Sequence, residues 1–96
     1  MELAKVKGQV VSTVRDQGLP NLTFLLVDIV DEHGNVTFPS QVAADTIGAG
    51  EGEMVLLVRG SSARMILEGK TPLDLSVVGI VDQITSGKEA IYRKYT

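Results

Sequence analysis

Hydrophobic and polar residues alternate with a period of two along the N-terminal segment. Between residues 2 and 14, one face carries Ala4, Val6 and Val10, and the other carries mostly polar side chains. Successive side chains of an extended chain point to opposite faces, so this pattern predicts a long, half-buried β-strand. Residues 16–21 are rich in turn-forming residues and end this strand.

The rest of the chain divides into short apolar segments separated by turns. Residues 22–30 are almost continuously apolar, which predicts a more deeply buried strand. A polar turn at residues 31–35 separates this strand from the next. A third strand is predicted around residues 36–38 and, past Pro39, 42–44, a fourth at 53–59 and a fifth at 75–84. A turn at 86–88 then leads into a final extended segment at 90–95.

One segment, residues 60–69, is predicted to form a short helix between the fourth and fifth strands. A serine near its start can cap the first turn, and Gly69 stands where a left-handed C-terminal residue is favoured. Together these elements predict an all-β fold, a small five-stranded barrel of the oligonucleotide/oligosaccharide-binding type with one short helix and an extended C-terminal tail. Closure into a barrel removes the exposed edges of a small sheet.

Composition supports this class and limits the functions. The 96 residues fit one domain, 1–96, and a 44% hydrophobic but only 4% aromatic composition implies a core of Val, Leu, Ile and Ala. A net charge of −3 without a basic cluster, and only two Phe and two Tyr, argue against nucleic acid as a partner. No run approaches the roughly 20 apolar residues of a membrane helix, and no secretory pattern stands at the start, so we expect a soluble cytoplasmic protein with no membrane partner.

The residues that could carry chemistry do not form a catalytic or metal-binding pattern. The chain has no cysteine, and its one histidine, His33, stands in a polar turn where a solvated role is expected. Gly69 and the two residues after it match the end of a phosphate-binding loop, but Arg64 occupies the place of the first glycine of that motif. Three aspartates beside turns or strand ends are expected to be solvated or paired at an interface: Asp45, Asp74 and Asp82. We therefore expect no catalytic residue, no metal site and no cofactor.

Two glycine-containing segments remain to be explained. The first is the glycine loop, which consists of Gly48, Ala49, Gly50, Glu51 and Gly52. Three glycines in five residues indicate unusual backbone angles or a very close approach of another chain. The second segment starts at Gly60 and continues through Ser61, Ser62, Ala63 and Arg64. Both permit the tight backbone packing of a subunit contact, and an ordinary tight turn and a helix cap are the alternatives.

Taken in order, these segments resemble the EutN/CcmL family of bacterial microcompartment vertex proteins. The resemblance rests on the glycine loop followed by Glu53, on residues 60–64, and on the run Val77-Val78-Gly79-Ile80-Val81-Asp82. Further matching segments are the opening Leu3-Ala4-Lys5-Val6 with Gly8 and residues 10–13, then Leu25-Leu26-Val27, and Val42-Ala43 with Asp45. Each segment alone is unspecific, but together they cover nearly the whole chain in the right order.

The resemblance implies a barrel that assembles into a cyclic homopentamer. In this family the pentamer occupies the five-fold vertices of a shell that is otherwise tiled by hexameric proteins. The implied partners are therefore further copies of this chain and hexameric shell proteins, and the implied location is the microcompartment shell in the cytoplasm.

The resemblance also assigns expected places to the two segments. The glycine loop is implied to lie nearest the five-fold axis around a narrow opening, with Glu51 pointing into solvent because five converging carboxylates repel one another. Residues 61–64 are implied to lie at subunit contacts, where Arg64 can form an ion pair or bind a carbonyl of the neighbouring subunit.

Two other functions stay open at this point. The same barrel can serve as a binding module for a small ligand or single-stranded nucleic acid, or a pentamer can pass small metabolites through its central opening. The last residues, 86–95, look closest to the ethanolamine-utilisation branch of the family, although glycyl-radical-type compartments carry similar subunits.

Overall fold

The computed structural model of the chain describes residues 1–11, 23–60 and 75–94. Within these ranges the regular structure consists of strands: β1 (Glu2–Val10), β2 (Thr23–Val30), β3 (Val36–Asp45), β4 (Met54–Arg59), β5 (Leu75–Ile80), β6 (Gln83–Ser86) and β7 (Glu89–Arg93). No helix in this part of the chain is long and apolar enough to cross a membrane.

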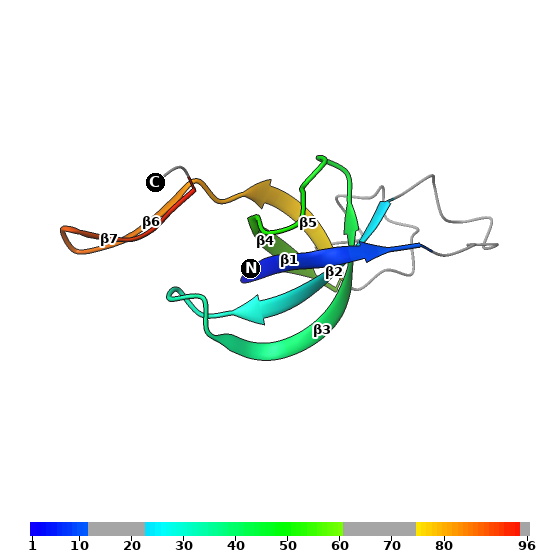
Figure 1. Cartoon of the computed structure of the whole chain (residues 1–96), viewed down its shortest axis with the longest axis horizontal. Helices are drawn as coiled ribbons and strands as arrows, with labels where there is room; N and C mark the ends of the chain where they lie inside the picture. The colour runs from blue at the N-terminus through cyan, green and yellow to red at the C-terminus, as the bar shows by residue number, and fades with distance from the viewer. Residues whose placement is uncertain (12–22, 61–74, 95–96) are drawn as a thin grey trace.

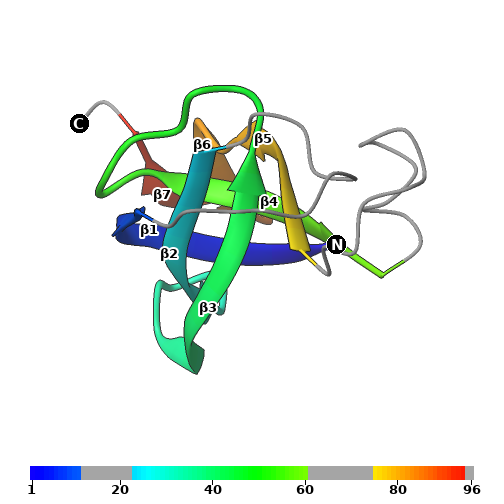
Figure 2. The same cartoon turned by 90° about the vertical axis from the view of Figure 1, so that its right-hand side faces the viewer.

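Five of the strands close into a barrel in the order β1-β2-β3-β5-β4 (Figure 1, Figure 2). All neighbouring pairs are antiparallel except β3 and β5, which run parallel and pair only through Ala44 with Ser76 and Asp45 with Val77. The inward-facing residues of the alternating patterns meet in one cluster: Ala4, Val6, Leu25, Val27, Ile29, Ala43, Ala49, Val55, Leu57, Leu75 and Val77. The all-β, five-stranded barrel predicted from the sequence is confirmed.

The third strand is continuous through Pro39, where the sequence predicts two separate pieces. Val27 pairs with Gln41 and Ile29 with Phe38, so β3 accommodates one extra residue there, and a second register shift follows between Ile29 and Val30. The bulge places Ser40 at a positive φ of 56°, and its amide donates a 2.9 Å hydrogen bond to Asp28 Oδ1. Proline interrupts a strand only where its missing N–H is needed, and a bulge is one of the places where it is not.

The predicted fifth strand is also divided differently. β5 ends at Ile80, and after Val81 and Asp82 the chain continues as β6, which pairs with β7 in a separate two-stranded sheet. We call this sheet the C-terminal hairpin; it projects from one end of the barrel (Figure 1). The sequence predicts one strand over residues 75–84 and, after the turn at 86–88, an extended tail; it does not predict the break between β5 and β6 or the separate sheet.

A second, smaller apolar cluster joins the barrel to the base of the C-terminal hairpin. Val30, Met54 and Val81 are buried in it. The partly buried side chains packed against it are Leu3, Leu56, Ile84 and Tyr92. The Val81 amide donates a 2.8 Å hydrogen bond to the Met54 carbonyl, which holds the chain against β4 as it leaves the barrel.

Two predictions lie partly outside the described residues. The short helix at 60–69 and the end of the first predicted strand, beyond residue 11, fall on residues that the structure does not describe. Both therefore remain predictions.

Candidate functional site

The glycine loop lies in the connection from β3 to β4 and is tied to β1 by backbone hydrogen bonds. The Gly52 amide donates to the Val6 carbonyl at 2.8 Å, and the Val6 amide donates to the Glu53 carbonyl at 2.9 Å. Gly48 and Gly52 have φ values of +82° and +88°, which side-chain-bearing residues rarely adopt. Two of the three glycines are thus explained by the positive φ angles that the loop backbone adopts.

A buried carboxylate organises the start of the connection. Asp45, which is only 6% exposed, accepts hydrogen bonds from the amide of Ile47 at 3.1 Å and from the amide of Ala49 at 2.9 Å. The expectation that Asp45 is solvated is therefore wrong, and a role in an interface stays a prediction. The signal in the sequence is an aspartate just before a glycine-containing turn, since Asp side chains bind backbone amides a few residues further along the chain.

A second carboxylate ties the glycine loop to the C-terminal hairpin. Glu53 Oε1 accepts a hydrogen bond from the Gly50 amide at 2.5 Å, and Glu53 Oε2 forms an ion pair with Lys94 Nζ at 2.7 Å. The hydrogen bond from Lys94, followed by that from the Gly50 amide, lowers the pKa of Glu53 below its ordinary value. Sequence reasoning did not single out this contact, because the two residues are 41 positions apart.

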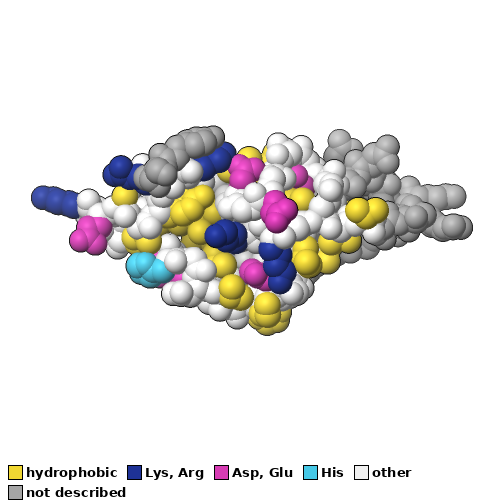
Figure 3. Space-filling view, in the orientation of Figure 1, with side chains coloured by type: hydrophobic (Ala, Val, Ile, Leu, Met, Phe, Trp, Pro, Cys, Tyr) yellow, Lys and Arg dark blue, Asp and Glu magenta, His cyan; other side chains and the backbone are white. Residues whose placement is uncertain are grey.

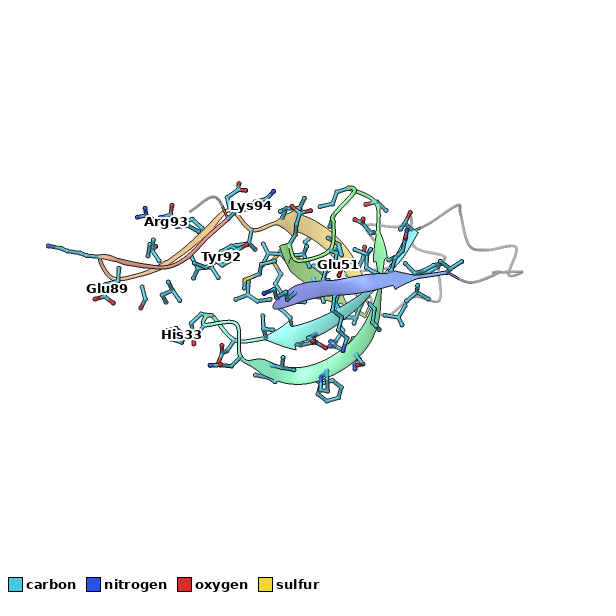
Figure 4. All side chains as sticks on the ribbon, viewed as in Figure 1. His33, Glu51, Glu89, Tyr92, Arg93 and Lys94 are labelled. Carbon is cyan, nitrogen blue, oxygen red and sulfur yellow. The ribbon has the colours of Figure 1, made fainter. Side chains whose placement is uncertain are left out.

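The five residues of the glycine loop differ in their exposure to solvent. Ala49 is buried and belongs to the barrel core, while Glu51 is exposed. A Cβ atom at Gly50 would lie 3.3 Å from Glu53 Oε1, so a side chain there presses on the Glu53 contact. Figure 4 shows Glu51 beside β1.

A shallow hollow of about 350 Å³ adjoins the loop. Its walls are Val6, Gly8, Gln9, Thr23, Leu25, Asp45, Gly48, Ala49, Gly50 and Glu51. Asp45, the one buried carboxylate among them, already accepts two amide hydrogen bonds. The geometry of the loop is thus accounted for by backbone contacts and fits a packing surface better than a reactive one.

The remaining candidate residues do not join this site. Ser61, Ser62, Ala63 and Arg64 lie outside the described residues. His33 lies in the exposed turn between β2 and β3, where Asp31 accepts hydrogen bonds from the amides of His33 and Asn35, both at 2.9 Å. Within residues 1–11, 23–60 and 75–94, no group of three His, Cys, Asp or Glu residues is arranged to hold a metal ion.

Comparison with known proteins identifies the family. The family model described as "Ethanolamine utilisation protein EutN/carboxysome" matches residues 1–82. The chain belongs to the EutN/CcmL family. The resemblance stated from the sequence is confirmed, and the match ends one residue before β6, so the C-terminal hairpin lies beyond it.

Similar proteins of this family match the chain over nearly all of its length. The bacterial microcompartment shell vertex protein EutN of Escherichia coli K12 is 50% identical over 95 residues, covering 98% of this chain and all of that protein. The structure of CcmL from Nostoc sp. PCC 7120 aligns with a TM-score of 0.88 at 46% identity, covering 98% of this chain and 100% of the other. The pentameric microcompartment shell protein GrpN from Rhodospirillum rubrum aligns with a TM-score of 0.80 at 40% identity, covering 91% of this chain and 100% of the other.

Proposed function

We propose that this chain is a structural shell protein that forms homopentamers at the five-fold vertices of a bacterial microcompartment, inside the cytoplasm. The observation that carries the proposal is the match to a shell vertex protein at 50% identity over 98% of the chain. The pentameric shell protein that shares the fold at a TM-score of 0.80 supports a ring of five. These relatives are structural proteins, which favours this role over a binding module built on the same barrel.

The proposed role is geometric. A flat sheet of hexameric units cannot close, and pentagonal units supply the curvature that closes it. The flanks of each barrel would then contact hexameric shell proteins, and its other faces would contact two copies of the same chain.

The proposed place of the glycine loop is beside the five-fold axis. Five copies of one segment converge there, so small residues and a compact, internally hydrogen-bonded backbone suit the position. Glu51 is the exposed carboxylate of the loop, and Ala49 is turned into the barrel core. Any opening on the axis would thus be bordered by the loop backbone, with Glu51 directed into solvent, where the five carboxylates stay apart. Residues 61–64 keep their proposed place at the subunit contact.

Native mass spectrometry of the full chain tests the assembly. The expected species has five times the 10.3 kDa mass of one chain. A monomer or dimer at micromolar concentration contradicts the proposal, and a monomer that binds single-stranded DNA supports the binding-module alternative instead.

A cysteine substitution in the glycine loop tests how the subunits are oriented within the pentamer. Because the chain has no cysteine, Glu51→Cys introduces the only thiol. If the glycine loop lies at the axis, mild oxidation links two neighbouring subunits within the pentamer. The matched control, Glu32→Cys in the exposed turn between β2 and β3, should stay unlinked. Equal linking of both variants contradicts the placement of the loop.

A further inference from the structure

The C-terminal hairpin is an arm with little support from its own barrel. Among the strands that the structure describes, β6 and β7 pair only with each other, and most of their residues are exposed. A space of about 600 Å³ separates the hairpin from the turn between β2 and β3, and residues Glu32, His33, Ile84, Glu89 and Ile91 line it. Figure 4 shows Glu89 far out on the arm and His33 across this space. A two-stranded hairpin by itself is at best marginally stable in water, so this arm needs a surface to lie on.

The base of the arm is nevertheless held firmly. Lys94 donates its amide to the Asp82 carbonyl at 2.8 Å, and its ammonium group pairs with Glu53 at 2.7 Å. Ile84 and Tyr92 pack against the buried cluster of Val30, Met54 and Val81. The direction of the arm is therefore fixed before any partner arrives, which lowers the entropy lost on binding.

A surface of matching kind lies on β3. This strand pairs with β2 on one side, but on its other side it pairs with β5 only from Ala44 onward. Among the residues that the structure describes, no strand pairs with that second edge at residues 36–38. Val36 and Phe38 are 53% and 59% exposed, and an exposed apolar edge is a feature that soluble proteins normally cover. Hydrophobic side chains gather along the lower margin of Figure 3, where β3 runs in Figure 1.

The edge of β3 also borders a hollow that can receive a side chain. The hollow measures about 370 Å³ and is lined by Glu2, Ile29, Thr37, Phe38 and Arg59. Its charged part is an ion pair between Arg59 Nε and Glu2 Oε2 at 2.8 Å, while Ile29 is buried. The tip of the C-terminal hairpin carries one charge of each sign, Lys88 and Glu89, beside the apolar residues Ala90 and Ile91. Both surfaces thus combine exposed apolar residues with neighbouring charges of both signs.

A cyclic ring needs two different surfaces on each subunit, because contacts between identical patches close into dimers. We propose that the C-terminal hairpin of one copy lies along the free edge of β3 in the next copy, with the β7 edge against residues 36–38 and with Ile91 beside Phe38. This inference rests on the proposed pentamer and assigns one of its contacts. The family model ends at residue 82, so the arm lies beyond the segment that the model matches.

Cross-linking between introduced cysteines tests the contact directly. The chain with Ala90→Cys and Val36→Cys carries one thiol on each proposed surface and no others. A bismaleimide spanning about 10 Å tolerates a register error of two or three residues, at roughly 3.3 Å per residue. We expect a covalent ladder that reaches the pentamer on denaturing gels. The control, Ala90→Cys with Val11→Cys, moves the second thiol to an exposed apolar residue at the far end of β1 and should give no ladder.

The outcomes separate this inference from the proposed function. A pentamer in native mass spectrometry without the ladder overturns the hairpin contact alone. A monomer or dimer overturns both the pentamer and the contact. Equal ladders from the test pair and the control pair indicate random collisions and also overturn the contact.

A substitution at the acceptor surface gives a second, independent test. Phe38→Asp replaces a largely exposed side chain, so the barrel should fold as before, which circular dichroism can verify. Loss of a central apolar anchor should raise the concentration at which the ring dissociates by about tenfold or more, with five subunits retained at high concentration. Val11→Asp makes the same chemical change away from the contact and should leave dissociation unchanged. An unchanged dissociation concentration for Phe38→Asp contradicts the proposal.

Discussion

The barrel and the C-terminal hairpin are stabilised in different ways. In the barrel, strands of six to ten residues bury side chains such as Leu57 and Val77 completely, and each strand has a hydrogen-bonded neighbour on both sides for at least part of its length. In the hairpin, strands of four and five residues find no other strand to pair with in the described part of the chain, and they keep most side chains exposed. The barrel is therefore stabilised by its own core and strand pairing. The hairpin is stabilised by the contacts at its base and, we propose, by a second subunit.

The largest effect should come from truncating the same kind of side chain in the two regions. Leu57→Ala leaves a cavity in the barrel core and should lower the free energy of unfolding by about 2–5 kcal/mol. Ile84→Ala removes a partly buried side chain at the hairpin base, where local opening limits the loss to about 1 kcal/mol or less. Chemical denaturation at one fixed protein concentration measures both values, because subunit association makes apparent stability depend on concentration.

Equal losses of unfolding free energy for Leu57→Ala and Ile84→Ala would contradict the separate stabilisation of the barrel and the hairpin. They would mean that the hairpin unfolds only together with the barrel. Val42→Ala is a suitable control, since Val42 is 50% exposed on the barrel and its truncation should stay within about 0.5 kcal/mol of the wild type.

A smaller effect should separate two glycines that share the same kind of backbone strain. Gly52 in the glycine loop has a φ of +88° and Gly87 in the hairpin turn has a φ of +63°, and a Cβ at either would meet no heavy atom within 4 Å. Strain is thus the only local cost, about 1–2 kcal/mol for an alanine in a left-handed conformation. Gly52→Ala should show this cost as a lower free energy of global unfolding.

In Gly87→Ala the same strain should appear only as faster hydrogen exchange of hairpin amides. Gly52→Asn is the control for the loop, because asparagine tolerates left-handed angles better than alanine. If Gly87→Ala lowers the global stability as much as Gly52→Ala, the two regions form one cooperative unit.

The same contrast explains how far the sequence could predict the fold. The barrel strands show periods or runs of apolar residues because each packs on one shared core, so residues 2–10 and 54–59 could be predicted from patterning alone. The end of β5 could not, since Val81 and Ile84 are as apolar as the strand before them. Only their packing against Val30 and Met54, distant in sequence, separates β5 from β6.

For the glycine loop, residue type predicts the unusual backbone angles but not the side-chain contacts that stabilise the loop. Positive φ values at Gly48 and Gly52 are local properties, which the glycine density indicated. The hydrogen bonds from the Ile47 and Ala49 amides to Asp45 are local too, but residue type alone does not distinguish such a bonded aspartate from a solvated one at a strand end. The Glu53–Lys94 ion pair depends on the path of the C-terminal hairpin, so no local pattern contains it.

The smallest effect should be a dependence on pH at the joint between the two regions. Lys94 and the Gly50 amide lower the pKa of Glu53 below its ordinary value of 4.5. A carboxylate with a depressed pKa in the folded state stabilises that state above its ordinary pKa, and the stabilisation is lost as the pH falls through the folded value. Hydrogen exchange of hairpin amides, corrected for intrinsic rates, should therefore accelerate as the pH is lowered below 4.5. Glu53→Gln keeps an acceptor for the Gly50 amide but carries no charge, so its hairpin should exchange fast at every pH.

The barrel pair of Lys7 and Asp28, at 2.9 Å, also weakens in acid, because the Ser40 amide and Lys7 lower the pKa of Asp28. That pair joins β1 to β2, and the Ser40 amide links Asp28 to β3, so Asp28→Asn should leave the acid response of the hairpin unchanged. Identical pH profiles for the wild type and Glu53→Gln would show that the joint is held by apolar packing alone.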